Sequence, residues 1–144
     1  MNGANFDPRT ALGGGISIKP GTTKTGAGAT SGDWVDCGDL NVSPVVSALC
    51  MIGASGGEEA VLTTTFKLQE ADTSGGSGAQ DIPVKEDVVL ASDGTKLGYA
   101  TGRRTKQFVR VVGTLVVSDT GTGTGGTPAQ PMSAAVLALK ENAG

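Results

Sequence analysis

The sequence predicts an all-β protein: an antiparallel β-sandwich, jelly-roll-like or Ig-like, of about seven to eight short strands with an extended N-terminal arm. Two segments, residues 59–72 and 106–119, alternate apolar and polar side chains and are rich in β-branched residues. Clusters of Gly, Pro and Asp separate the apolar runs, and 24 of the 144 residues are glycine. The length fits one domain.

The N-terminal segment is low in sequence complexity. Residues 1–32 are mostly Gly, Thr and Ala, with one short β-like run at residues 16–19. Such a segment buries too little apolar surface to offset the entropy cost of ordering it. We therefore expect an extended arm over residues 1–32 and a sandwich domain over residues 33–144.

Two strands are expected directly after the arm. Residues 33–40 indicate a short strand that carries Trp34. Residues 44–54 are apolar nearly throughout, which predicts a strand covered on both faces.

Each of the two alternating segments divides into two faces. In residues 59–72 one face carries Leu62, Thr64, Phe66 and Leu68. In residues 106–119 the more apolar face carries Val109, Val111, Leu115 and Val117. Both segments have the period of two that a strand with one buried face requires.

Two further segments, residues 84–102 and residues 131–140, have apolar runs that are shorter or fit more than one kind of element. Residues 84–102 contain two short apolar runs around Asp93-Gly94, a dipeptide that favours a type I′ hairpin. Residues 131–140 follow a glycine-rich loop, and we expect a closing strand there, with a helix as the open alternative.

Composition narrows the function classes. The chain has no histidine, which excludes Ser-His-Asp and Cys-His catalysis and His-containing metal sites. We expect no catalytic residue, no cofactor and no metal; a calcium site at Asp33, Asp36 and Asp39 is a weaker alternative. A net charge of −3 argues against direct nucleic-acid binding, and we expect neither a membrane span nor a secretory signal.

A chain for which no secretory signal is expected is made in a reducing cytosol, which bears on its cysteines. Cys37 and Cys50 are the two cysteines. We expect buried free thiols, and a disulfide remains the alternative if their strands are adjacent.

One cluster of cations is a candidate contact site. Within eight residues the chain carries Arg103, Arg104, Lys106 and Arg110. Residues 103–106 suit the end of a strand that must be protected from edge pairing. Arg110 is expected to pair with a carboxylate of this subunit or of a neighbour. A single-strand nucleic-acid groove that uses Tyr99 and Phe108 is the weaker alternative.

Two stretches resemble a known protein group. They read "FKLQEADTSGGSGAQDI" (residues 66–82) and "LGYATGRRTKQFVRVVGTL" (residues 97–115), and "WVDCGDL" lies upstream. Together they resemble small proteins of tailed bacteriophages that are described as head decoration, cement or auxiliary capsid proteins. The matching positions are Leu68, Gln69, Glu70, Asp72, Asp81, Ile82, Gly98, Tyr99, Gly102, Arg103, Arg104, Phe108, Val109, Arg110 and Val111.

The resemblance implies a structural virion protein without catalysis, located on the capsid exterior and made in the bacterial cytoplasm. The expected partners are the major capsid protein and further copies of this chain, with a homotrimer preferred and a dimer second. The expected contacts use the cation cluster and the arm.

A carbohydrate-binding or adhesin-like sandwich module on a phage fibre or tail is the alternative. It predicts that Trp34 and Tyr99 are exposed, whereas the capsid-protein hypothesis predicts that both are largely buried.

Overall fold

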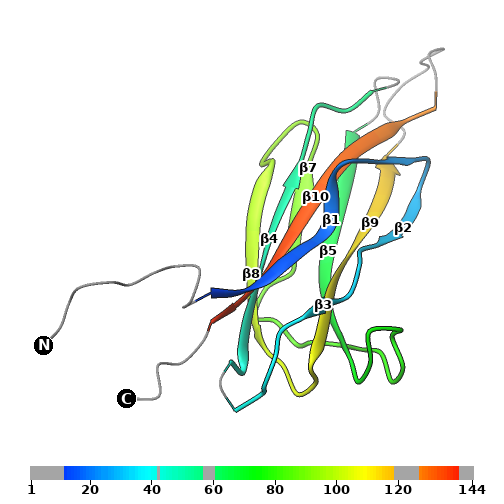
Figure 1. Ribbon diagram of the computed structural model, residues 1–144. Coiled ribbons are helices and arrows are strands. Elements are labelled where there is room, and N and C mark those ends of the chain that lie inside the picture. The colour runs from blue at the N-terminus through cyan, green and yellow to red at the C-terminus, as the bar shows by residue number, and fades with distance from the viewer. Residues whose placement is uncertain (1–11, 42, 57–60, 119–126, 140–144) are drawn as a thin grey trace, which may run out of the picture.

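The computed structural model describes residues 12–41, 43–56, 61–118 and 127–139. These residues form ten β-strands and no helix, arranged as two antiparallel sheets that pack face to face (Figure 1). The prediction of an all-β sandwich is confirmed, although several strands are longer than expected. Since the described residues contain no helix, none of them forms a helix that could cross a membrane.

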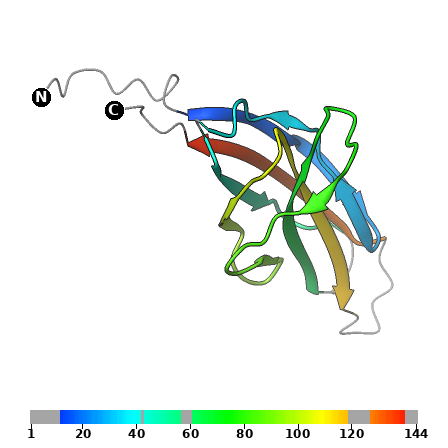
Figure 2. The same cartoon turned by 90° about the horizontal axis from the view of Figure 1, so that it is seen from below.

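The two sheets form curved layers (Figure 2). The four-stranded sheet has the order β1 (Leu12–Thr25), β10 (Ala129–Leu139), β4 (Val45–Ile52) and β8 (Leu97–Arg103). The main path of the six-stranded sheet is β2 (Gly28–Ser31), β9 (Phe108–Ser118), β5 (Val61–Ala71) and β6 (Gln80–Asp81). Two further strands complete it: β3 (Val35–Asp36) pairs with β9, and β7 (Val88–Ala91) pairs with β5.

The prediction of an N-terminal arm is wrong for residues 12–31. They form β1 and β2, which pair with β10 and β9 in opposite sheets. Backbone pairing and two buried side chains hold this glycine-rich segment in the sandwich. Ile18 lies in the core. Ser17 Oγ donates to the Asp33 carbonyl at 2.9 Å and accepts from the Val111 amide at 2.8 Å. The expected domain boundary at residue 32 therefore falls inside the sandwich, and residues 1–11 lie outside the described residues.

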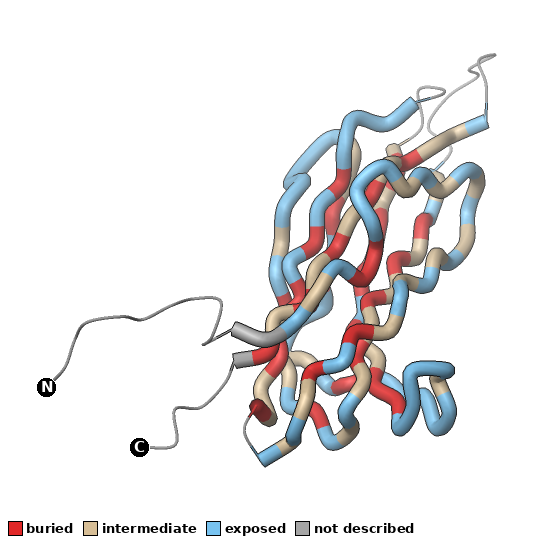
Figure 3. Tube along the Cα trace, viewed as in Figure 1, coloured by how far each residue is buried: buried red, intermediate tan, exposed pale blue. Residues whose placement is uncertain are grey.

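The core lies between the inner faces of the sheets. Burial alternates along the long strands, as the banding in Figure 3 shows. In β5 the face of Leu62, Thr64, Phe66 and Leu68 points inward, and Phe66 is the largest fully buried side chain among the described residues. In β9 the more apolar face also points inward, although Val117 is only partly buried. The C-terminal segment is the expected strand, β10, as far as Leu139; residue 140 lies outside the described residues.

The predicted hairpin at Asp93-Gly94 is wrong. The two flanking strands join different sheets, because β7 pairs with β5 and β8 pairs with β4. The connection is a turn in which the Gly94 amide donates to the Ala91 carbonyl at 3.0 Å, and it carries the chain from one sheet to the other.

Both cysteines are buried free thiols, as expected. Burial raises the pKa of Cys37 to about 11, although the charge of Arg104 opposes the shift. Burial also raises the pKa of Cys50 to about 12. Because the thiolate is the reactive form, both side chains act as small apolar core groups at neutral pH.

A glycine substitution tests the packing of β1 against β10. Gly14 has φ of 138°, and an added Cβ would overlap the carbonyl oxygen of Val136. Positive φ alone costs a non-glycine residue about 1–3 kcal/mol. With the overlap added, we expect Gly14→Ala to lower the free energy of unfolding by about 3 kcal/mol or more in urea titration. Gly56→Ala is the matched control, because an added Cβ there meets no atom within 4 Å. Equal stabilities of the two variants would contradict this pairing.

Candidate protein-binding surface

The four predicted contact cations do not form one patch. Arg104 is only 2% exposed, whereas Arg103 is exposed at the end of β8. Lys106 and Arg110 are partly buried and bond to groups of their own chain near the six-stranded sheet. The cluster that the sequence suggests is therefore divided among three roles.

The Arg104 side chain connects two segments that run from one sheet to the other, which we call the crossings. One runs from β3 to β4 through residues 37–44, and the other runs from β8 to β9 through residues 104–107. The guanidinium group donates to six backbone carbonyls, those of Cys37, Gly38, Asp39, Ser43, Lys106 and Gln107, at 2.6–3.3 Å. Only arginine offers so many donors in a fixed planar arrangement. The expectation that Arg104 contacts a neighbouring protein is therefore corrected, because its donors are taken up inside the subunit.

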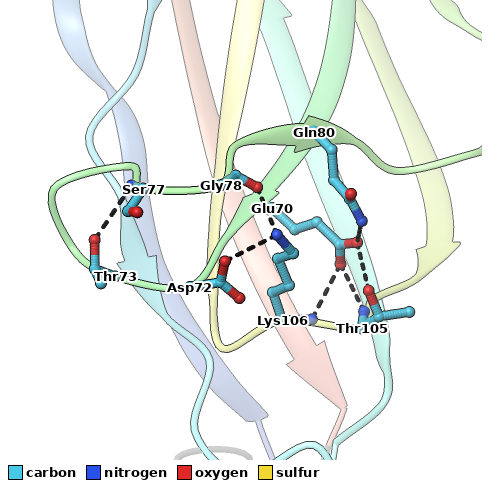
Figure 4. Close-up of polar contacts among 8 residues, drawn as sticks. All are labelled: Glu70, Asp72, Thr73, Ser77, Gly78, Gln80, Thr105 and Lys106. Atoms are coloured by element: carbon cyan, nitrogen blue, oxygen red, sulfur yellow. Dashed lines mark hydrogen bonds and ion pairs between the residues drawn. The ribbon is translucent and has the colours of Figure 1, made fainter.

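Glu70 holds the same crossing from the other side. Its buried carboxylate accepts from the Thr105 amide at 2.6 Å, the Thr105 hydroxyl at 2.7 Å and the Lys106 amide at 3.2 Å (Figure 4). Gln80 Nε2 donates to it at 2.6 Å. Burial alone would raise the pKa of Glu70, but these hydrogen bonds outweigh it and the pKa is lowered from its ordinary 4.5. Glu70 thus fixes the turn at residues 105–106 to the end of β5.

Lys106 closes the loop that follows β5. Its ammonium group lies 3.0 Å from Asp72 Oδ2 and donates to the Gly78 carbonyl at 2.6 Å (Figure 4). The loop over residues 72–78 is thereby tied back to the turn after β8. This ion pair is partly exposed, so we assign it a local positioning role and not a large share of stability.

Arg110 packs on Trp34. Its guanidinium carbon lies 4.4 Å from the ring centroid, and its Nε and Nη2 donate to Gln69 Oε1 at 3.0 and 2.9 Å. The expected carboxylate partner is therefore replaced, in the described chain, by an amide oxygen and an aromatic face. Trp34 is partly covered by this contact and lies close to Gly76.

The exposed surface with the clearest potential for contacts is the outer face of the four-stranded sheet. The register aligns Tyr99, Leu49, Ala135 and Ile16 in one row across all four strands. Met51 and Leu97 are paired in the next row. We call Ile16, Leu49, Met51, Leu97, Tyr99 and Ala135 the apolar face. Five of these side chains are largely exposed: Ile16 53%, Leu49 39%, Met51 48%, Leu97 55% and Tyr99 76%.

The surroundings of the apolar face are nearly uncharged. Among the residues that alternate outward on β10, β4 and β8, only Arg103 is charged, and it pairs in register with Val45 at one end. The fourth strand, β1, carries Lys19 and Lys24 beyond Ile16. An apolar area with charged residues at its margins resembles the core and rim of a protein interface.

This surface corrects two expectations. The apolar run at residues 44–54 predicts a strand covered on both faces, but the residues that the structure describes cover β4 on one face only. The predicted burial of Tyr99 is also wrong for the single subunit, and Trp34 is intermediate. Sequence reasoning missed the apolar face because it expected residues 44–54 to be covered on both faces, Tyr99 to be buried and Ile16 to lie in an arm.

The acidic residues give no sign of a metal centre. The described part of the chain contains no group of three or more His, Cys, Asp or Glu side chains placed to hold a metal ion. Asp33 pairs with Lys19 at 3.2 Å, and Asp36 accepts from the Gly38 amide and from Gln107. Comparison with protein-family models, with curated proteins and with solved structures finds no match.

Substitution of Arg104 tests its role as a structural tie. Arg104→Lys keeps the charge but loses the planar set of donors, so buried carbonyls lose their partners. We expect a loss of at least about 3 kcal/mol in the free energy of unfolding. Arg103→Lys, one residue away on the exposed face, should change it by less than about 0.5 kcal/mol. If urea titration gives the two variants equal stability, the guanidinium group does not hold the crossings.

The lowered pKa of Glu70 predicts a specific acid response. A group whose pKa is lowered by folding stabilises the native state above its unfolded pKa and loses this contribution as the pH falls through the folded value. Stability should therefore decline below about pH 4.5, the ordinary value for this group. Glu70→Gln should be less stable at pH 7 and should show a shallower decline between pH 5 and pH 3, measured by urea titration at each pH. An unchanged acid slope would show that other carboxylates, such as Asp36 and Asp81, dominate it.

Proposed function

We propose that the protein is a structural virion protein, an auxiliary capsid decoration or cement protein that binds the outside of a tailed-phage head as a small homo-oligomer. Its partner is the major capsid protein, and its role is to stabilise contacts between capsomers. The single observation that carries the proposal is the apolar face of the four-stranded sheet.

The energetic case rests on exposed apolar surface. Burying a large apolar side chain fully contributes about 1.5–3 kcal/mol, and four of the side chains on this face are about half exposed or more. Contiguous apolar surface on a soluble protein marks an interaction site. The pattern of β4 points the same way, because its sequence is that of a strand with both faces covered, and the described residues of the chain cover one. A partner that packs on this face supplies the missing cover.

The remaining features suit a passive binding role. Arg103 stands at the margin of the face, where its planar group can pair with a carboxylate of the partner. The crossings at one end of the sandwich are fixed by Arg104 and Glu70, so the face is presented on a stable support. On a symmetric shell, many weak copies of one contact add up through multivalency.

A charge placed in the centre of the apolar face tests this proposal. Leu49→Glu should leave folding intact, because the side chain points away from the core, but it puts an unpaired charge into the interface. We expect binding to purified heads that lack this protein to weaken at least about tenfold, measured by gel densitometry of sedimented particles.

Val116→Glu is the matched control for that experiment. Val116 is 51% exposed on β9, in the other sheet, and is therefore not part of the apolar face. Its substitution should leave head binding unchanged. Full occupancy by the Leu49→Glu protein, or equal losses for both variants, would refute the assignment of this face.

One observation favours the second candidate, a carbohydrate-binding module on a fibre or tail. Tyr99 is 76% exposed, and an exposed aromatic ring is a platform on which a sugar can stack. The two candidates separate in a glycan-binding assay. Binding of a glycan that is lost in Tyr99→Ala, together with no uptake by heads, favours the module.

A further inference from the structure

The open side of the sandwich is formed by two strand edges. β8 is the last strand of the four-stranded sheet, and β7 pairs only with β5 in the part of the chain that the structure describes. The segment before β7 pairs with β8 through an isolated bridge between Val84 and Gly102, and Val88 of β7 lies close to Gly98 of β8. Beside that bridge lies an open groove of about 570 Å³ between β7 and β8.

Alternate residues of β8 direct their backbone hydrogen-bonding groups to opposite sides of the strand. The Arg104 amide donates to the Pro44 carbonyl at 2.9 Å, and the Ile52 amide donates to the Lys96 carbonyl at 3.0 Å. In an antiparallel ladder these two bonds assign the intervening even-numbered residues to the bonds with β4. The amides of Leu97, Tyr99 and Thr101 therefore point away from β4, toward the groove.

This open edge lacks the usual protection against pairing. Native edges are blunted by charges, prolines or bulges, and residues 97–101 contain none of these. The cations that were expected to protect the strand do not do so: Arg104 and Lys106 bond to their own chain, and Arg103 lies beyond the Gly102 bridge. The edge is thus competent to accept another strand.

The shape of the groove selects the kind of strand. The inward side of β8 is made of small residues because β7 lies close: a Cβ added at Gly98 would lie 2.8 Å from Val88 Cγ1. A strand added beside β8 needs small inward residues and can carry large outward ones. β8 itself has this pattern, with Gly98 and Ala100 inward and Leu97 and Tyr99 outward.

We propose that β8 pairs antiparallel with β8 of a second copy of this chain. The pairing joins two four-stranded sheets edge to edge and makes one continuous apolar face from two. Residues 97–101 are themselves uncharged, and the charged residues that also line the groove, Lys85, Glu86 and Asp87, carry both signs. A two-fold pairing of this kind gives a dimer, the second of the two oligomeric states expected from the sequence.

The dimer deepens the proposed function, since doubling the face doubles the contact with a shell, but it can fail separately. Self-association is measured on the pure protein without heads, so its outcome does not depend on capsid binding. The first measurement is sedimentation equilibrium over a range of protein concentrations, which should show a monomer–dimer equilibrium.

A pair of variants at one position isolates the backbone contribution. Tyr99→Ala removes the side chain but keeps the outward amide, whereas Tyr99→Pro removes both, and proline is tolerated at a sheet edge. We expect the dimer dissociation constant of Tyr99→Pro to exceed that of Tyr99→Ala by at least about tenfold, because each copy loses one intersubunit hydrogen bond.

Amide exchange of the unmodified protein provides an independent readout if the proline variant does not fold. The amides of Leu97, Tyr99 and Thr101 should exchange slowly in the dimer and quickly after dilution. The amides of Gly98, Ala100 and Gly102 should stay protected in both states and serve as the internal control. A protein that remains monomeric, or a dimer whose odd-numbered β8 amides exchange quickly, overturns the proposal.

Discussion

The arrangement of this sandwich depends on a single buried guanidinium group. A chain with so many glycines has few large side chains to hold its connections, and the crossings between sheets must be fixed by other means. Arg104 does this by collecting backbone carbonyls from both crossings, and Glu70 binds the amides of the turn from the opposite side. A buried positive charge and a buried negative charge are thus satisfied by backbone groups of opposite polarity, without a direct ion pair between them.

This polar framework explains why the chain can present an apolar sheet face to its surroundings. The core is built mainly from Val, Leu, Ile and Ala, with Cys37, Cys50, Met132 and one large aromatic, Phe66, and it occupies the space between the sheets. The outward residues of β4 and β8 are not needed for that core, yet they are also apolar. We attribute the apolar character of these outward residues to contacts outside the subunit. In our proposals these contacts are with the shell on the apolar face and with a second copy at the β8 edge.

The sequence predicted the sandwich and its main core strands, because a period of two in Val- and Thr-rich segments is determined by local geometry. It failed where pairing partners decide the structure. Residues 12–31 have little apolar surface, but they form strands because β9 and β10 offer complete backbone edges. The runs on either side of Asp93-Gly94 have the pattern of a hairpin, but β7 pairs with the longer β5 in one sheet and β8 pairs with the longer β4 in the other.

The candidate site was harder to predict than the fold. The spacing of the cations along the sequence does not show which of their side chains point into the sandwich. Arg104 is buried because the fold brings residues 37–39 and 43 beside it. The apolar face could not be predicted from the pattern of β4, because the outward Leu49 and the inward Ala48 are both apolar and the sequence does not show which of them is exposed. The phage-protein function stays a proposal, and several residues that carry the resemblance, Glu70, Asp72 and Arg104 among them, have structural roles in this chain.

Methionine oxidation tests the central claim, that the apolar face is the contact surface, most directly. Met51 is 48% exposed on that face and Met132 is 2% exposed in the core. Peroxide should oxidise Met51 rapidly in the free protein and leave Met132 intact, and peptide mass spectrometry reports both sites. On assembled heads, the account predicts that Met51 becomes protected while Met132 stays unchanged. Equal oxidation of Met51 in free and head-bound protein would contradict it.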